Sequence, residues 1–89
     1  MVPIGSLSGL LVRVWDAVRR SGLSKLAWRL REYADSKKRE APNLYAFSRA
    51  ALVRELGRYA NRFRDVIEFM EERGWAVKVK NPPDHWQIN

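Results

Sequence analysis

Residues 52–75 hold the feature that most constrains the fold of this chain: two short segments of helical periodicity, each followed by a glycine. The first segment ends at Gly57 and the second at Gly74. Glycine readily adopts the left-handed conformation that ends a helix. The stretch therefore predicts a helix, a turn and a second helix. The second helix has an apolar face with i, i+3, i+4, i+7 spacing, formed by Phe63, Val66, Ile67 and Met70.

The residues after Gly74 alternate between apolar and polar types, which is typical of a half-buried β-hairpin. Its tip, Asn81-Pro82-Pro83-Asp84, is stiff because two prolines restrict the backbone. A rigid basic tip suits contact with a phosphate backbone, and a plain solvent-facing turn would use the same residues. Alternation predicts outward side chains at Lys78, Lys80 and Gln87, and core-facing side chains at Trp75, Val77, Val79, Trp86 and Ile88.

Helix, turn, helix and basic hairpin, in that order, are the parts of a winged helix-turn-helix. Over residues 48–89 the chain resembles bacterial and archaeal regulators of the MarR and ArsR kind. The resemblance lies in Leu52-Val-Arg-Glu-Leu-Gly57 and Glu72-Arg-Gly-Trp75, and in the spacing between the two glycines. The sequence departs from that family at Tyr59-Ala60, where a Ser or Thr usually precedes the recognition helix. Asn61 is the nearest good N-cap, so we expect that helix from about residue 60 or 61 to residue 73.

The N-terminal half predicts two helices, over residues 7–20 and 24–38, separated by a stop signal at Ser21-Gly22. Trp28 points away from the apolar stripe of the second helix. It is expected either to pack against the first helix or to contact a partner. The buried face of the second helix is predicted to contain Leu23, Leu26, Ala27, Leu30, Tyr33 and Ala34.

Residues 36–42 read as a frayed helix end and a loop, because Pro42 disfavours helical geometry at the preceding residue. This charged run is expected to be solvated surface or, alternatively, a phosphate contact. Residues 44–47 predict a short strand. Ser48 is then expected to cap a helix that ends at Leu56. The predicted fold class is mainly α with a small C-terminal β-hairpin, in one domain over residues 1–89. Residues 7–20 form its additional N-terminal helix, and residues 23–89 form a winged-helix core.

The net charge of +7 indicates a polyanionic partner, either nucleic acid or, less favoured, an anionic membrane surface. The excess is larger in residues 1–42, with nine Lys or Arg against four Asp or Glu, than in residues 43–89, with eight against six. This distribution weakens any claim that the recognition helix alone holds the ligand.

Nothing in the sequence indicates an enzyme, a cofactor or a metal. The chain has no cysteine, and its single histidine, His85, can complete neither a catalytic triad nor a metal cluster. No segment is long and apolar enough to span a bilayer, so no membrane partner is expected. The first residues do not form a persuasive signal peptide, and we expect a cytoplasmic protein.

The leading functional hypothesis is a DNA-binding protein, a small transcriptional regulator that reads duplex DNA with helix 61–73 and a basic wing over residues 76–88. Arginine and asparagine suit base edges because they bind guanine and adenine bidentately. A homodimer through the N-terminal helix is a plausible arrangement for such a regulator. The nucleic-acid-binding residues are expected to be Arg58, Asn61, Arg62 and Arg64 at the major groove, Lys78 and Lys80 on the wing, and Arg49 and Arg54 on the supporting helix.

The alternative hypothesis is a winged-helix subunit that docks on RNA or protein within a larger nucleic-acid complex. The basic first half of the chain, the tryptophan at position 28 and the acidic later face of helix 61–73 favour this second reading.

Overall fold

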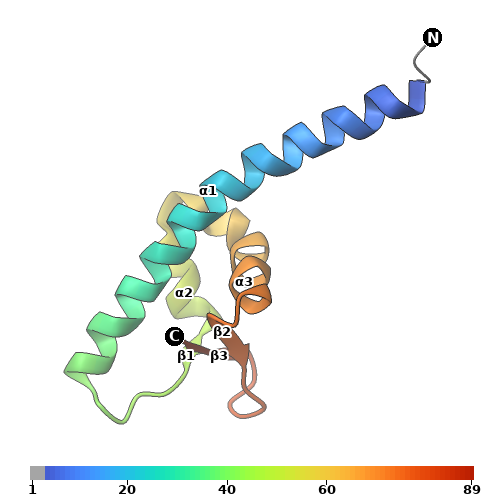
Figure 1. Cartoon of the computed structure of the whole chain (residues 1–89). Coiled ribbons are helices and arrows are strands. Elements are labelled where there is room, and N and C mark those ends of the chain that lie inside the picture. The colour runs from blue at the N-terminus through green and yellow to red at the C-terminus, as the bar shows by residue number, and fades with distance from the viewer. Residues whose placement is uncertain (1–3) are drawn as a thin grey trace.

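A computed structural model describes the backbone of residues 4–89 and the side chains from Gly22 onward. The chain is mainly helical, with a small three-stranded antiparallel sheet (Figure 1), in agreement with the predicted class of mainly α structure with little β. Its elements are α1 (Ile4–Glu40), β1 (Phe47–Ser48), α2 (Arg49–Leu56), the 3-10 helix η1 (Gly57–Arg62), α3 (Phe63–Glu72), β2 (Ala76–Lys78) and β3 (His85–Ile88).

The predicted helix break at Ser21-Gly22 is wrong, because α1 is one continuous helix through this point. Gly22 is not among the glycines with positive φ, which are Gly57 and Gly74. A glycine inside a helix is disfavoured by only about 1 kcal/mol relative to alanine. Here it leaves room for Arg62, whose Nη1 lies 2.9 Å from the position that a Cβ would occupy. The dimer contact expected on residues 7–20 concerns side chains outside the described residues.

The start of α2 agrees with prediction, whereas the start of α3 does not. Ser48 caps α2, and its Oγ accepts a hydrogen bond from the Ala51 backbone nitrogen at 3.1 Å. The predicted cap at Asn61 is wrong, because this residue lies inside η1 and α3 begins at Phe63. The turn conformation of Tyr59, with φ −97° and ψ 17°, interrupts the helical path and delays α3.

The sheet has the strand order β1-β3-β2, so the expected hairpin is joined by the short strand that precedes α2. Ala76 is buried and Val77 is 49% exposed, which makes the predicted core position of Val77 wrong. The cause lies at Trp75, whose backbone nitrogen donates to the Met70 carbonyl at 2.8 Å. This residue therefore completes the end of α3, and strand alternation begins one residue later. Lys78 then pairs with Trp86 across the sheet.

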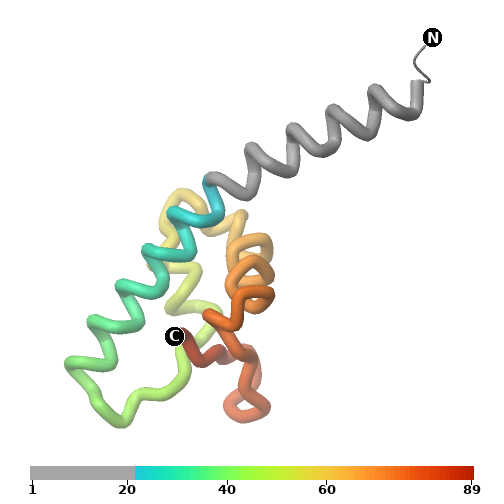
Figure 2. The backbone as a smooth tube through the Cα atoms, in the orientation of Figure 1, coloured from blue at the N-terminus to red at the C-terminus, as the bar shows by residue number. Residues whose placement is uncertain are grey.

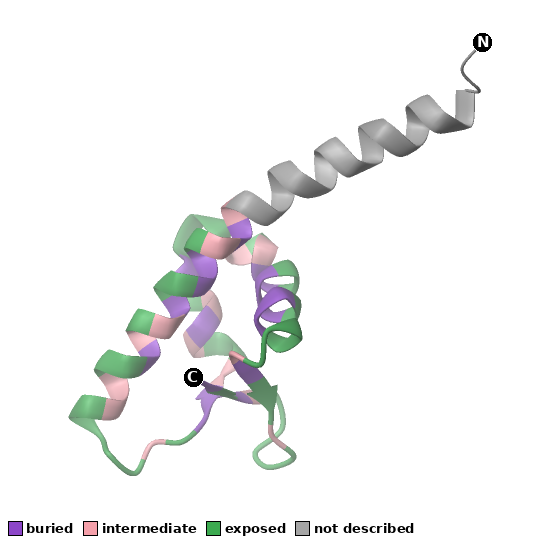
Figure 3. Ribbon diagram, in the orientation of Figure 1, coloured by how far each residue is buried: buried purple, intermediate pink, exposed green. Residues whose placement is uncertain are grey.

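One hydrophobic core joins α1, α2, α3 and the sheet (Figure 3). Leu30 from α1, Leu52 from α2 and Met70 from α3 are fully buried in it. The C-terminal residues return to α1 (Figure 2), where Arg31 and Lys38 donate hydrogen bonds to the carbonyls of Asn89 and Ile88. The predicted buried face of residues 23–34 is confirmed, with its tyrosine at the edge of the core. Both α1 and α3 therefore bury one face in this shared core and expose the other face to solvent.

Candidate nucleic-acid interface

The eight predicted site residues do not form one surface. Three of them, Arg49, Arg64 and Lys78, line a groove between α2, α3 and the sheet. Arg62 instead lines a pocket between α1 and η1. The other four are exposed and line neither of these hollows: Arg54 in α2, Arg58 and Asn61 in η1, and Lys80 beyond the end of β2.

The first of these surfaces, here called the hairpin groove, has a volume of about 520 Å³. Its apolar floor includes Phe63 and Trp86, whose rings meet edge to face with centroids 5.5 Å apart. The guanidinium of Arg49 lies 5.4 Å from the Phe63 centroid, and Lys78 Nζ lies 5.6 Å from that of Trp86. The groove is lined by Arg49, Phe63, Arg64, Ile67, Glu68, Glu71, Lys78 and Trp86.

Carboxylates accompany each cation of the hairpin groove. Asp84 Oδ1 lies 3.6 Å from Arg49 Nη2 and 4.0 Å from Lys78 Nζ, and Arg64 Nε lies 3.5 Å from Glu68 Oε1. Exposed ion pairs of this kind contribute roughly 0–1 kcal/mol to stability. Together with Glu71, which lines the groove, Asp84 and Glu68 make three carboxylates against three cations, and this local balance leaves little net attraction for a polyanion.

The exposed face of α3 is acidic. It carries one arginine and four carboxylates: Arg64, Asp65, Glu68, Glu71 and Glu72. A helix inserted into a DNA groove lies between two rows of phosphates, so unpaired carboxylates on this face would be repelled. This is the surface from which a groove-reading helix would contact base edges.

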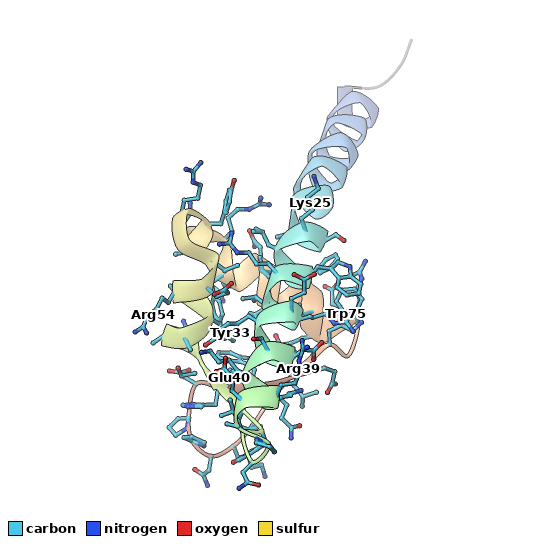
Figure 4. All side chains as sticks on the ribbon, turned by 90° about the vertical axis from the view of Figure 1, so that its left-hand side faces the viewer. Lys25, Tyr33, Arg39, Glu40, Arg54 and Trp75 are labelled. Carbon is cyan, nitrogen blue, oxygen red and sulfur yellow. The ribbon has the colours of Figure 1, made fainter. Side chains whose placement is uncertain are left out.

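The second surface, here called the α1–η1 pocket, has a volume of about 340 Å³. Three cationic side chains, Lys25, Arg29 and Arg62, converge on it from two elements distant in sequence. None of its described lining residues is acidic. Figure 4 shows Lys25 on the outer surface of α1. The described lining consists of Gly22, Lys25, Leu26, Arg29, Tyr59 and Arg62.

Among the residues whose side chains the structure describes, one carboxylate pairs with a cation of the α1–η1 pocket. Glu55 of α2 has its Oε1 3.7 Å from Arg29 Nε, with the Arg29 side chain half exposed. Among the described residues that line the pocket, Lys25 and Arg29 of α1 bring two positive charges to it, and Glu55 offsets one of them. A concave cationic surface with low-dielectric walls concentrates its field on an anion that enters it.

Three cations in the charged run at the end of α1 contact other groups of the chain, two of them within α1 itself. Lys37 Nζ lies 3.5 Å from Glu40 Oε2, and Arg39 Nε donates to the Asp35 carbonyl at 3.4 Å. Lys38 donates to the C-terminal strand. These contacts favour a structural and solvated role for the run over a phosphate-binding one.

Sequence reasoning missed the contribution of Lys25, Arg29 and Tyr59 to the α1–η1 pocket. The i, i+4 spacing of Lys25 and Arg29 on an exposed helix face was the available signal. Their approach to Arg62 depends on how α1 crosses η1, and no local pattern encodes that crossing.

Comparison with protein-family models, curated proteins and solved structures gives no match for this chain. Among residues 4–89, no helix is both long and apolar enough to cross a membrane. The described residues also contain no group of three or more His, Cys, Asp or Glu side chains arranged to hold a metal ion. His85 contacts its own turn, with Nδ1 2.9 Å from the Pro83 carbonyl oxygen.

Proposed function

We propose that this chain is a winged-helix domain that binds the phosphate backbone of nucleic acid through the α1–η1 pocket, as a docking module of a larger nucleic-acid complex. Helix, short strand, helix, helix and hairpin follow one another in the order expected of a winged helix. The observation that carries the proposal is the location of positive charge. Lys25 and Arg29 of α1 and Arg62 of η1 line the α1–η1 pocket, whereas four carboxylates occupy the exposed face of α3.

Phosphate is the ligand chemistry that fits this pocket best. Arginine presents a planar fork of donors to phosphate oxygens, and lysine supplies a compact point charge. Such contacts give affinity and position on the backbone and carry little sequence information. The affinity of such binding falls steeply as the salt concentration rises. The reason is that each neutralised phosphate releases condensed counterions, and this release is less favourable at high salt.

A second candidate function, the regulator that reads duplex DNA with α3 and the hairpin, is favoured by one observation. Arg49, Arg64 and Lys78 come from three different elements and line a single groove. In this alternative the hairpin groove would grip the backbone at the edge of the DNA groove. The neighbouring carboxylates would then have to pair with these cations or accept from cytosine amino groups.

Two charge-matched double variants separate the candidates. Lys25→Ala/Arg29→Ala removes two cations from the α1–η1 pocket, and Arg64→Ala/Lys78→Ala removes two from the hairpin groove. Both lower the net charge equally, so a difference between them reports location. Binding to labelled duplex DNA, single-stranded DNA and structured RNA is followed by fluorescence anisotropy over a salt series.

The first double variant is expected to bind about tenfold or more weakly at low salt and to reduce the slope of log affinity against log salt by about 1 to 2. The second is expected to stay within about threefold of the unmodified protein. The opposite ranking would support the duplex-reading regulator. Equal losses of affinity in the two variants would mean that binding depends only on the net charge of the protein. That result would contradict both proposed binding surfaces.

A further inference from the structure

Trp28 forms an exposed aromatic surface on α1 that the hydrophobic core does not require. Its side chain is 51% exposed. Its ring centroid lies 6.1 Å from that of Trp75, with an angle of 52° between the planes. The guanidinium carbon of Arg31 lies 4.5 Å from the Trp28 centroid and 4.3 Å from the Trp75 centroid. The expected packing of Trp28 against a separate first helix is therefore wrong, because its ring contacts are with the segment after α3.

Several contacts hold this aromatic surface in place. Arg31 Nε donates to the Asn89 carbonyl at 2.7 Å, which fixes the guanidinium between the two tryptophans. Trp75 meets the buried Phe69 at 6.0 Å, and the Arg73 guanidinium lies 3.6 Å from the Phe69 centroid. A single exposed apolar residue is common on protein surfaces. An exposed ring already held by stacked neighbours differs, because binding need not immobilise it further.

This aromatic surface adjoins the α1–η1 pocket. Trp28 lies three residues after Lys25, a spacing that makes side chains neighbours on a helix surface. Arg29 points toward α2, where it meets Glu55, and Trp28 is turned about 100° from it around the helix axis, toward Trp75. Figure 4 shows Trp75 and Arg54 of α2 on opposite sides of α1. A ligand that lies across α1 would thus meet the cations first and the aromatic rings next.

Cations interleaved with exposed aromatic rings are the combination by which proteins bind single strands. Phosphates follow the cationic surface, and unpaired bases stack on the rings. Tyr59, which is 40% exposed, adds an aromatic side chain on the pocket side of the cations. Bases inside an intact duplex are stacked on one another and do not offer their faces to an external ring. The arrangement therefore selects unpaired nucleotides.

We propose that the Trp28–Trp75 surface stacks an unpaired base of a single-stranded nucleic acid whose phosphates occupy the α1–η1 pocket. This inference rests on the proposed function and names the substrate class of that site. The contribution of the ring is separable from that of the charges, because stacking requires a base and phosphate contact does not.

The test compares labelled oligothymidylate with an abasic oligonucleotide of the same length, which keeps the phosphates and lacks the bases. Trp28→Leu removes the aromatic plane and keeps an apolar side chain, and Trp28→Tyr keeps a smaller plane. Tyr45→Leu is the matched control, because Tyr45 is another exposed aromatic residue, at 54%. It lies in the loop before β1, where its hydroxyl donates to the Asn81 carbonyl. Circular dichroism confirms that each variant is folded.

The unmodified protein is expected to prefer oligothymidylate over the abasic strand by about fivefold to a hundredfold. Trp28→Leu is expected to abolish this preference with the abasic affinity unchanged, Trp28→Tyr to retain most of it, and Tyr45→Leu to leave it intact. A preference that survives Trp28→Leu overturns the inference. Equal binding of both strands, weakened by Lys25→Ala/Arg29→Ala, also overturns it and leaves the proposed function standing. Failure to bind either strand overturns the inference alone when duplex DNA or structured RNA still binds, and contradicts the proposed function as well when none of these nucleic acids binds.

Discussion

The exposed faces of α1 and α3 lie on the same core and differ in charge. Both helices bury an apolar stripe, and both leave charged residues outside. On α3 those residues are mostly acidic, whereas α1 turns Lys25 and Arg29 toward a pocket shared with Arg62. A helix placed where a recognition helix is expected therefore need not be the surface that attracts a polyanion. Net charge is a property of the chain, and affinity depends on where that charge gathers.

The contrast between the two faces depends on α1 and α3 belonging to one cooperative unit. Leu30→Ala in α1 and Met70→Ala in α3 each remove a fully buried side chain. Each is expected to lower the free energy of unfolding by about 2–5 kcal/mol, through lost burial and the cavity left behind. Urea unfolding followed by circular dichroism measures it. Val77→Ala, at an exposed position, is the control and is expected to change stability by less than about 0.5 kcal/mol. Two separate transitions in either core variant would mean that the faces belong to independent units.

Gly22→Ala is expected to move one group of the α1–η1 pocket, the Arg62 guanidinium. Alanine is favoured over glycine inside a helix, so stability is expected to rise by about 0.5–1 kcal/mol. The added Cβ would lie 2.9 Å from Arg62 Nη1, so the guanidinium must shift. Affinity for single-stranded DNA is then expected to fall by about two- to fivefold. Thermal unfolding measures the expected rise in stability, and fluorescence anisotropy measures the expected fall in affinity. Higher stability with unchanged affinity would remove Arg62 from the binding surface.

A pair of neutralised acids compares the two faces directly. Glu55 lies beside Arg29 at the α1–η1 pocket, and Glu68 lies beside Arg64 on α3. Glu55→Gln is expected to raise nucleic-acid affinity by about two- to fivefold, because it leaves Arg29 uncompensated at the proposed phosphate site. Glu68→Gln changes the net charge equally and is expected to raise affinity by less than about twofold. Titrations at low salt measure both. A larger gain in Glu68→Gln would place the polyanion on α3.

The smallest effect is expected at the hairpin tip. Lys80 is exposed and lies beyond the end of β2, outside the lining of both described hollows. Lys80→Ala is expected to change affinity for single strands by less than about twofold, because an exposed charge distant from the ligand is screened by salt. Anisotropy at physiological ionic strength checks it. A loss comparable to that of Lys25→Ala/Arg29→Ala would show that the tip contacts the backbone, as a wing does.

Much of the local structure could be predicted from the sequence. The Ser48 cap, the left-handed Gly74 and the apolar spacing on α3 are local signals, and each appears in the structure. Predictions failed where a contact that the pattern does not reveal overrode the expected structure. Gly22 reads as a helix stop, yet α1 runs through it. Trp75 reads as the first strand residue, yet it completes the end of α3 and shifts the pattern of the hairpin by one position.

The class of fold, the basic character of the chain and the lack of cysteine chemistry all follow from the amino-acid sequence. Helical and strand periodicity are local signals, and charge and cysteine content are read directly from the composition. Only the tertiary structure decided which cations lie together. Arg62 is two residues from Arg64 in the chain, yet the first lines the α1–η1 pocket and the second the hairpin groove. The physical reason is that η1 ends between them and α3 begins, so successive side chains leave the backbone toward different neighbours. A surface built from α1 and η1 exists only once the core has brought those two elements into contact.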